Sequence, residues 1–189
     1  RENSQIRFET LKNQLNPHFL FNSLNVLSTL IKHDSEKAQV FVDEFSSVYR
    51  YTLDVIEKPV VELGEEINFA KSFLYLQKIR FNNAVDLEIN VDASKLRYLV
   101  PPLAIQTLLE NAFKHNKASV HNKLKINIYN EDDALVVINN LQPKIKGNDS
   151  KGVGLNNLRK RYELLGEKFP QFSVTEKEYI VKIPLINPE

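Results

Sequence analysis

The sequence has 189 residues, of which 42% are hydrophobic and 26% are charged, a balance typical of a globular protein with a buried core. It contains no cysteine, which excludes disulfide bonds and thiolate metal sites. A formal net charge of +1 provides no strong field for recruiting nucleic acid, so we expect no nucleic-acid partner.

Residues 1–56 contain no glycine, and their apolar side chains recur at three- and four-residue spacing, which predicts helices. Pro17 falls inside the first helical pattern and should kink that helix. The break at residues 33–35 offers an N-cap for a second helix. One stripe of the first helix comprises Leu20, Leu24, Leu27 and Ile31, and one face of the second comprises Phe41, Phe45, Val48, Thr52 and Val55.

We expect these two helices to form an antiparallel hairpin over residues 1–56. A lone hairpin leaves apolar stripes uncovered, and a second copy would cover them by completing a four-helix bundle in a dimer. The alternative is that both helices pack on the rest of their own chain.

The remainder of the chain alternates between helical and strand patterns. Residues 57–64 are predicted to be a linker, and a polar loop is expected over residues 142–151. Strict apolar alternation over residues 85–91 predicts a half-buried strand, and Pro101 and Pro102 should open a helix. We therefore expect helices on one face of a largely antiparallel sheet, which makes the fold α+β. The expected elements are helices at 65–80, 101–113 and after Gly154, and strands at 85–91, 124–128, 135–138, 172–174 and 180–183.

The segment 16–22 reads Asn-Pro-His-Phe-Leu-Phe-Asn and places a histidine directly after the proline. Neutral imidazole is a nucleophile at physiological pH and can hold a phosphoryl group, so His18 is a candidate phosphoryl acceptor. An ordinary structural histidine is the alternative. Asn22 lies four residues later, on the same helix face. His33 and His121 fall in predicted turns without metal-spaced partners, and we interpret them as surface residues.

Four segments, in the same order, resemble those of the LytS-like sensor histidine kinases. Residues 16–22 resemble the phospho-acceptor box of this family, and residues 74–81 resemble the segment that leads into its catalytic domain. Residues 100–116 resemble its N box, and residues 151–166 resemble its second glycine box. The family belongs to the ATPases with the Bergerat, or GHKL, nucleotide-binding fold.

The resemblance implies a division into three parts: a dimerising phosphotransfer hairpin over 1–56, the linker 57–64, and a Bergerat-type α/β sandwich over 65–189. It implies that the γ-phosphate of ATP moves to His18 and then to an aspartate of a response regulator. The implied catalytic residues are His18, Glu110 and Asn22. In related kinases a polar side chain at the Asn22 position helps a water molecule attack the phosphorylated partner.

The resemblance also implies a site for Mg²⁺ and ATP. Asn111 would offer its carbonyl oxygen to Mg²⁺, and Lys114 would approach the phosphates as a point charge. Glycines at 152 and 154 would let backbone N–H groups approach a phosphate at the positive end of a helix. The implied nucleotide-binding residues are Asn111, Lys114, His115, Asn139, Gly152, Gly154, Leu155 and Asn157, with Asn111 as the metal ligand.

Five residues, at three places in the chain, depart from the family pattern. Asn139 stands where an adenine-binding aspartate is usual, and Leu141 replaces the following glycine. An asparagine carbonyl can still accept the hydrogen bond, at a loss on the order of 1 kcal/mol. Phe19 follows the histidine where many kinases carry an acid, so the proton of His18 must pass to Glu110 or to solvent. Glu178 and Tyr179 also replace a Gly-Thr pair that often precedes the last strand.

Two other functions fit the same residues. One is a kinase-like dimer that has lost ATP turnover and acts as a signalling interaction module. The other is a Bergerat-fold enzyme that phosphorylates a serine elsewhere, with His18 incidental.

No apolar run approaches the roughly 20 residues of a membrane-spanning helix. Because the chain starts at Arg1 and lacks methionine, we expect a fragment or a processed product. The family resemblance implies that it is the cytoplasmic portion of an inner-membrane sensor.

Overall fold

The computed structural model describes residues 16–144 and 153–188. Helices α2 (Pro17–His33) and α3 (Ser35–Val55) form the expected hairpin. Asp34 is the N-cap between them, and its side chain accepts a hydrogen bond from the Lys37 N–H at 3.0 Å. Pro17, which was expected to kink a longer helix, is the first residue of α2 and follows an N-cap at Asn16; the residues before Asn16 lie outside the described part of the chain, so the kink stays a prediction. Proline is tolerated there because the first helical N–H has no intrahelical partner.

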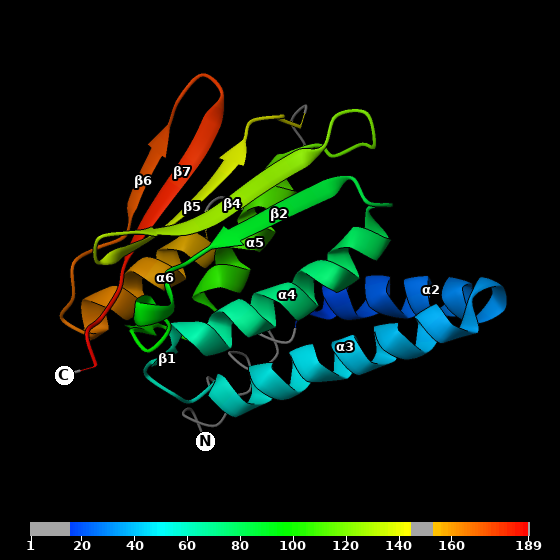
Figure 1. Cartoon of the computed structure of the whole chain (residues 1–189), viewed down its shortest axis with the longest axis horizontal. Helices are drawn as coiled ribbons and strands as arrows, with labels where there is room; N and C mark the ends of the chain where they lie inside the picture. Colours follow the sequence, from blue (N-terminus) through cyan, green and yellow to red (C-terminus); the bar gives the residue numbers. More distant parts are fainter. Residues whose placement is uncertain (1–15, 145–152, 189) are drawn as a thin grey trace.

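One side of the hairpin packs on helix α4 (Leu63–Arg80) of the same chain (Figure 1). The rings of Phe19 and Phe73 lie 5.3 Å apart in this contact. The predicted face of α3 is largely buried, which confirms its periodicity, and it faces its own chain as in the alternative considered above. Several large apolar side chains of the hairpin stay exposed: Phe21, Leu24, Ile31, Val40, Val42 and Leu53.

Helix α4 begins at Leu63, inside the segment expected to be a linker. Its first N–H groups need acceptors outside the helix. The Leu63 N–H donates to the Tyr98 carbonyl at 2.7 Å, and the Gly64 N–H donates to the Leu96 carbonyl at 2.9 Å. These bonds accompany a small antiparallel pair, β1 (Val61–Glu62) with β3 (Leu99–Val100), which the sequence did not predict.

The main sheet has five strands in the order β2-β4-β5-β7-β6. Strands β2 and β4 are parallel, and the other neighbours are antiparallel, which confirms the expected topology. Helices α4, α5 and α6 cover one face of this sheet (Figure 1). The bounds are β2 (Val85–Asn90), η1 (Ala93–Lys95), α5 (Ala104–His115), β4 (Leu124–Glu131), β5 (Ala134–Asn140), α6 (Val153–Leu164), β6 (Gln171–Val174) and β7 (Glu178–Pro184).

The core lies between the sheet and these helices. Alternate residues of β4 are buried, whereas β5 is buried at three successive residues, Leu135, Val136 and Val137, and again at Asn139. Helix α5 starts after the two prolines rather than on them, because Leu103 adopts a left-handed conformation with φ 60°. Among the described residues, none of the helices combines the length and the apolar character of a membrane span.

Candidate active site

His18 lies in the first turn of α2 and is exposed. Its Nδ1 atom is 3.1 Å from the Nδ2 atom of Asn22. The four-residue spacing noted in the sequence therefore brings the two side chains into direct contact.

Asn16 connects the start of α2 to the N-box helix α5. Its Nδ2 donates to Oε1 of Glu110 at 2.8 Å, across 94 residues of sequence. Its Oδ1 accepts the N–H of Phe19 at 3.2 Å, which caps α2. Asn16 is the first residue of the phospho-acceptor box, and the sequence pattern indicated no role for it.

Glu110 is enclosed by these contacts. Gln106 donates through Nε2 to the same Oε1 atom at 3.0 Å. Burial raises the pKa of the Glu110 carboxyl, and the hydrogen bonds from Gln106 and Asn16 act in the opposite direction. The structure thus joins this predicted catalytic residue to the phospho-acceptor helix through Asn16.

The predicted nucleotide-binding residues of α5 lie in its second half. Asn111 is half-buried, whereas Lys114 and His115 are exposed in the last turn. Asn116 ends this segment and is buried, with Nδ2 donating to the Ala112 carbonyl at 3.0 Å.

The segment after β5 is attached to the C-terminal end of α5. Oδ1 of Asn116 accepts the N–H of Gln142 at 2.8 Å, and the Lys117 N–H donates to the Gln142 carbonyl at 2.7 Å. Lys144 donates through Nζ to the Phe113 carbonyl at 2.8 Å. The beginning of the polar loop predicted over residues 142–151 is therefore anchored to the N-box helix. Gly152 and the rest of that loop lie outside the described residues.

Asn139 is 3% exposed on the helix-facing side of β5. Its Nδ2 donates to the Asn140 carbonyl at 2.8 Å. This bond fixes the nitrogen end of the amide and leaves the oxygen end to accept hydrogen bonds.

Gly154 lies against α5. It therefore has a packing role in addition to the role expected for it in phosphate binding. A Cβ atom at this position would lie 3.2 Å from Cγ2 of Thr107. Leu155 is half-buried and Asn157 is exposed on the same helix.

Two arginines of α6 point in different directions. Arg159 lies over the ring of Phe172 on the sheet, 5.9 Å from its centroid. Arg161 donates to the Pro102 carbonyl, just before α5.

Glu66 of α4 is a buried polar group that the sequence did not single out, and it is 0% exposed. Its carboxylate accepts the N–H groups of Leu103 at 2.7 Å and Ile105 at 3.0 Å, and the hydroxyl of Tyr51 at 2.8 Å. Glu66 therefore caps α5 from another helix and ties it to α3. The adjacent Glu65 is exposed, and nothing in the local sequence distinguishes the two acids.

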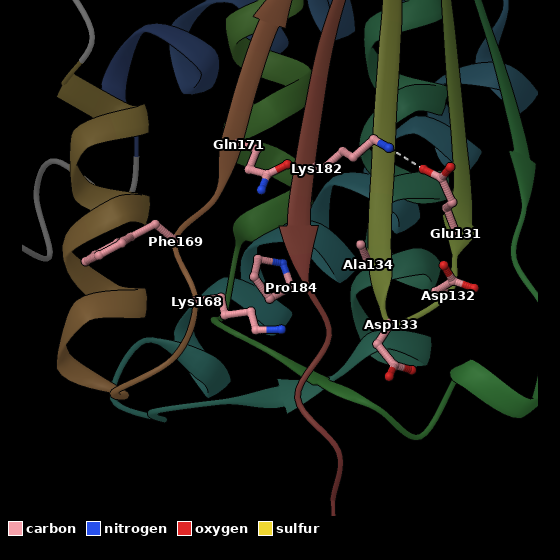
Figure 2. A pocket seen from close by; sticks show the side chains of 9 residues that line it. All are labelled: Glu131, Asp132, Asp133, Ala134, Lys168, Phe169, Gln171, Lys182 and Pro184. Carbon is pink, nitrogen blue, oxygen red and sulfur yellow. Dashed lines mark hydrogen bonds and ion pairs between the residues drawn. The ribbon is translucent and has the colours of Figure 1, made fainter.

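Two cavities formed by described residues lie elsewhere. The cavity in Figure 2 has a volume of about 460 Å³ and lies between the β4–β5 turn and the segment from α6 to β6. It includes Ala134, so it adjoins the end of β5 opposite to Asn139. The other, of about 260 Å³, lies between α3 and α4 beside Tyr51. Neither is lined by a predicted site residue.

Several known proteins are similar in sequence to this chain. The family model for histidine kinases matches residues 6–85. The sensor protein LytS of Staphylococcus haemolyticus is 37% identical over 107 residues, which cover 57% of this chain and 18% of that protein. The sensor protein LytS of Enterococcus faecalis is 29% identical over 174 residues, covering 83% of this chain and 29% of that protein.

A solved structure described as a bacterial phosphotransferase superposes with a TM-score of 0.53 at 10% identity, covering 92% of this chain and 93% of that chain. This likeness concerns the fold alone. A helical hairpin followed by a mixed sheet with helices on one face, together with the family match, defines a histidine kinase core. The chain belongs to the LytS-like sensor histidine kinases. It spans less than a third of the length of these relatives.

Proposed function

We propose that this chain is the kinase core of a two-component sensor and transfers the γ-phosphoryl group of ATP to His18. The observation that carries the proposal is the hydrogen bond between Asn16 and Glu110. It holds the turn that bears an exposed imidazole against the helix that carries the N box. A phosphoryl acceptor must be exposed so that ATP can reach it. Phosphoryl transfer depends mostly on positioning the acceptor and neutralising charge.

The transfer step assigns each ring nitrogen of His18 a role. The Nε2 lone pair attacks the γ-phosphorus, an N–P bond forms, and the P–O bond to ADP breaks. This requires the proton on Nδ1, where Asn22 lies at 3.1 Å. Turned so that its oxygen faces the ring, the Asn22 amide would accept that N–H and hold the required tautomer. The proton then leaves Nδ1 for Glu110 or solvent.

The residues present fit a magnesium nucleotide. The buried Asn139 amide has its nitrogen engaged, so its oxygen would accept a hydrogen bond from the adenine amino group. Asn111 would supply an oxygen to Mg²⁺, the ligand type that this cation prefers. Lys114, His115, Gly154, Leu155 and Asn157 would hold the rest of the nucleotide, and Gly152, assigned to it as well, lies outside the described residues. ATP supplies the phosphoryl group, and Mg²⁺ neutralises its charge.

The partners follow from the relatives, which carry the name sensor protein. Phosphorylated His18 would donate to an aspartate of a response regulator, and Asn22 would help a water molecule attack that phosphoryl aspartate. The exposed apolar side of the hairpin would pair with a second copy. A membrane sensor region in the longer protein would make this chain its cytoplasmic portion, with residues 1–56 as the phosphotransfer hairpin and residues 65–189 as the catalytic domain.

Incubation with γ-labelled ATP tests the proposal. The wild-type chain should acquire label that is stable in alkali and lost in acid, as a phosphoramidate is, and His18→Gln should acquire none. His33→Gln, an exposed histidine at the end of α2, is the matched control and should label normally. Equal labelling of wild type and His18→Gln would refute the assignment. Phosphatase activity unchanged in Asn22→Ala would refute the role of Asn22.

A further inference from the structure

Asn16 uses both ends of its amide at once. The oxygen caps α2 through the N–H of Phe19 at 3.2 Å, and the nitrogen donates to Glu110 at 2.8 Å. The residue adopts a left-handed conformation with φ 42°, which asparagine tolerates better than most residues. Pro17 follows and fixes the next φ angle. The conformation of Asn16 and the fixed φ angle of Pro17 together restrict the direction of α2.

No other common side chain can make both contacts at this position. Aspartate and serine cap a helix about as well as asparagine does, but aspartate has no proton to donate. The serine hydroxyl is attached to Cβ, too close to the backbone to cap α2 and reach Glu110 together. Glutamine has the donor but is a poor cap, because its amide lies one carbon further from the backbone. The geometry therefore requires an asparagine for a reason beyond helix capping.

The acceptor is equally constrained. Glu110 is partly buried and meets Asn16 and Gln106 through one oxygen. Phe19, the residue after His18, is 5% exposed, and its ring lies tilted against the ring of Phe73 at 5.3 Å, which adds an apolar contact to the same turn. A polar and an apolar contact thus flank His18 and fix the turn that carries it.

We propose that Asn16 is a positioning residue: its hydrogen bond to Glu110, here called the clasp, holds His18 at the N-box helix for phosphoryl transfer. This inference rests on the proposed function. It assigns to Glu110 a docking role that is separate from accepting a proton. The competing explanation is that Asn16 only caps α2 and that its contact with Glu110 is incidental.

The variant Asn16→Asp separates the two explanations, because it keeps the cap and replaces the donor with a second carboxylate facing Glu110. The clasp predicts that Asn16→Asp lowers the urea midpoint at neutral pH. It also predicts that the wild-type midpoint returns in Asn16→Asp/Glu110→Gln, where the glutamine amide donates to the new carboxylate. Asn25→Asp, the same change on the exposed side of α2, should leave the midpoint unchanged. A midpoint unchanged in Asn16→Asp, or no recovery in the double variant, would overturn the clasp.

Kinetics supply a readout that capping alone would not move. Asn16→Asp should lower the rate of His18 labelling at saturating ATP by at least about tenfold, with unchanged ATP affinity. The deficit should shrink as the pH falls, because the introduced carboxyl group then regains a proton to donate. A rate that parallels wild type at every pH would overturn the proposal. The urea midpoints require no ATP, so the clasp is tested even if the wild-type chain proves unable to transfer phosphate.

Discussion

At the scale of the residue, Asn139 shows how a departure from a family pattern is accommodated. Aspartate is usual there, yet the Asn139 nitrogen donates to the Asn140 carbonyl inside the sheet. A carboxylate would lose this bond and face a carbonyl oxygen at close range. The asparagine therefore stabilises the strand end while keeping an acceptor for a purine amino group.

We predict that Asn139→Asp destabilises the nucleotide-free chain by about 1–3 kcal/mol, because a buried carboxylate would replace a satisfied amide. Urea denaturation measures the free energy of unfolding, and Asn127→Asp on the exposed side of β4 is the control. An equal loss in both variants would show that the buried bond of Asn139 does not matter.

Individual residues also show where sequence reasoning ends. The spacing of His18 and Asn22 on one helix predicted their contact, because neighbours on a helix are fixed by its geometry. The contact of Asn16 with Glu110 spans 94 residues and depends on how the hairpin packs, which no local pattern encodes. The choice of Glu66 over Glu65 as the buried acid is equally a property of the packed structure.

At the scale of the element, the start of α5 depends on a residue from another helix. Its N-cap, Leu103, provides no side-chain hydrogen bond, and Glu66 accepts the N–H groups instead. The α5 start was expected at the prolines, because proline favours the first helical position. The left-handed Leu103 moves it to Ala104. Apolar alternation correctly predicted the five-stranded sheet, whereas the two-residue strands β1 and β3 are too short to show any period.

Glu66 should make stability depend on pH. Burial raises the pKa of its carboxyl above the unfolded value, although bonds from Ile105 and Tyr51 oppose this. A raised folded-state pKa gives stability that is fully present below the unfolded pKa and is lost as the pH rises through the folded pKa. The free energy of unfolding of wild type relative to Glu66→Gln should therefore fall from about pH 4 upwards. Glu65→Gln, at the exposed neighbour, is the control, and a relative stability that rises with pH would contradict this expectation.

The packing of α6 on α5 yields a second prediction at this scale. In Gly154→Ala the new methyl would press on Cγ2 of Thr107, which offsets the gain of about 1 kcal/mol that alanine brings to a helix. Thr107→Ser removes that methyl and keeps the hydroxyl that bonds to the Leu103 carbonyl at 2.9 Å. We expect Gly154→Ala to be near neutral or destabilising in urea, and Gly154→Ala/Thr107→Ser to be more stable than Thr107→Ser alone.

The double variant also isolates the role of Gly154 towards phosphate. If ATP requires a bare backbone there, ATP affinity should stay low in Gly154→Ala/Thr107→Ser even though the packing is relieved. Wild-type affinity in the double variant would limit Gly154 to a packing role.

At the scale of the whole molecule, the hairpin has two apolar sides with different surroundings. One packs on α4 through Phe19 and the inner face of α3. The other is open, with Phe21 and Ile31 68% and 62% exposed. The first side therefore confirms packing on the hairpin's own chain, whereas pairing with a second copy stays a prediction for the open side. The open side is the surface on which we expect a second copy.

We predict that Ile31→Glu weakens self-association, because a charge would be buried in an apolar helical interface. Sedimentation equilibrium should give a mass of two chains for wild type and of one chain for the variant. Leu164→Glu, which changes a more exposed leucine at the end of α6, should not change the mass. A wild-type chain that is already monomeric, or a dimer that survives Ile31→Glu, would contradict this interface.

The most direct test of the proposed reaction is the position of the phosphoryl group. Peptides from the chain, treated with ATP and Mg²⁺ and kept in alkali, should carry one phosphoryl group, on the nitrogen of His18, when mapped by mass spectrometry. A phosphoryl group on a serine, or none on His18 under conditions where the chain binds ATP, would contradict the reaction.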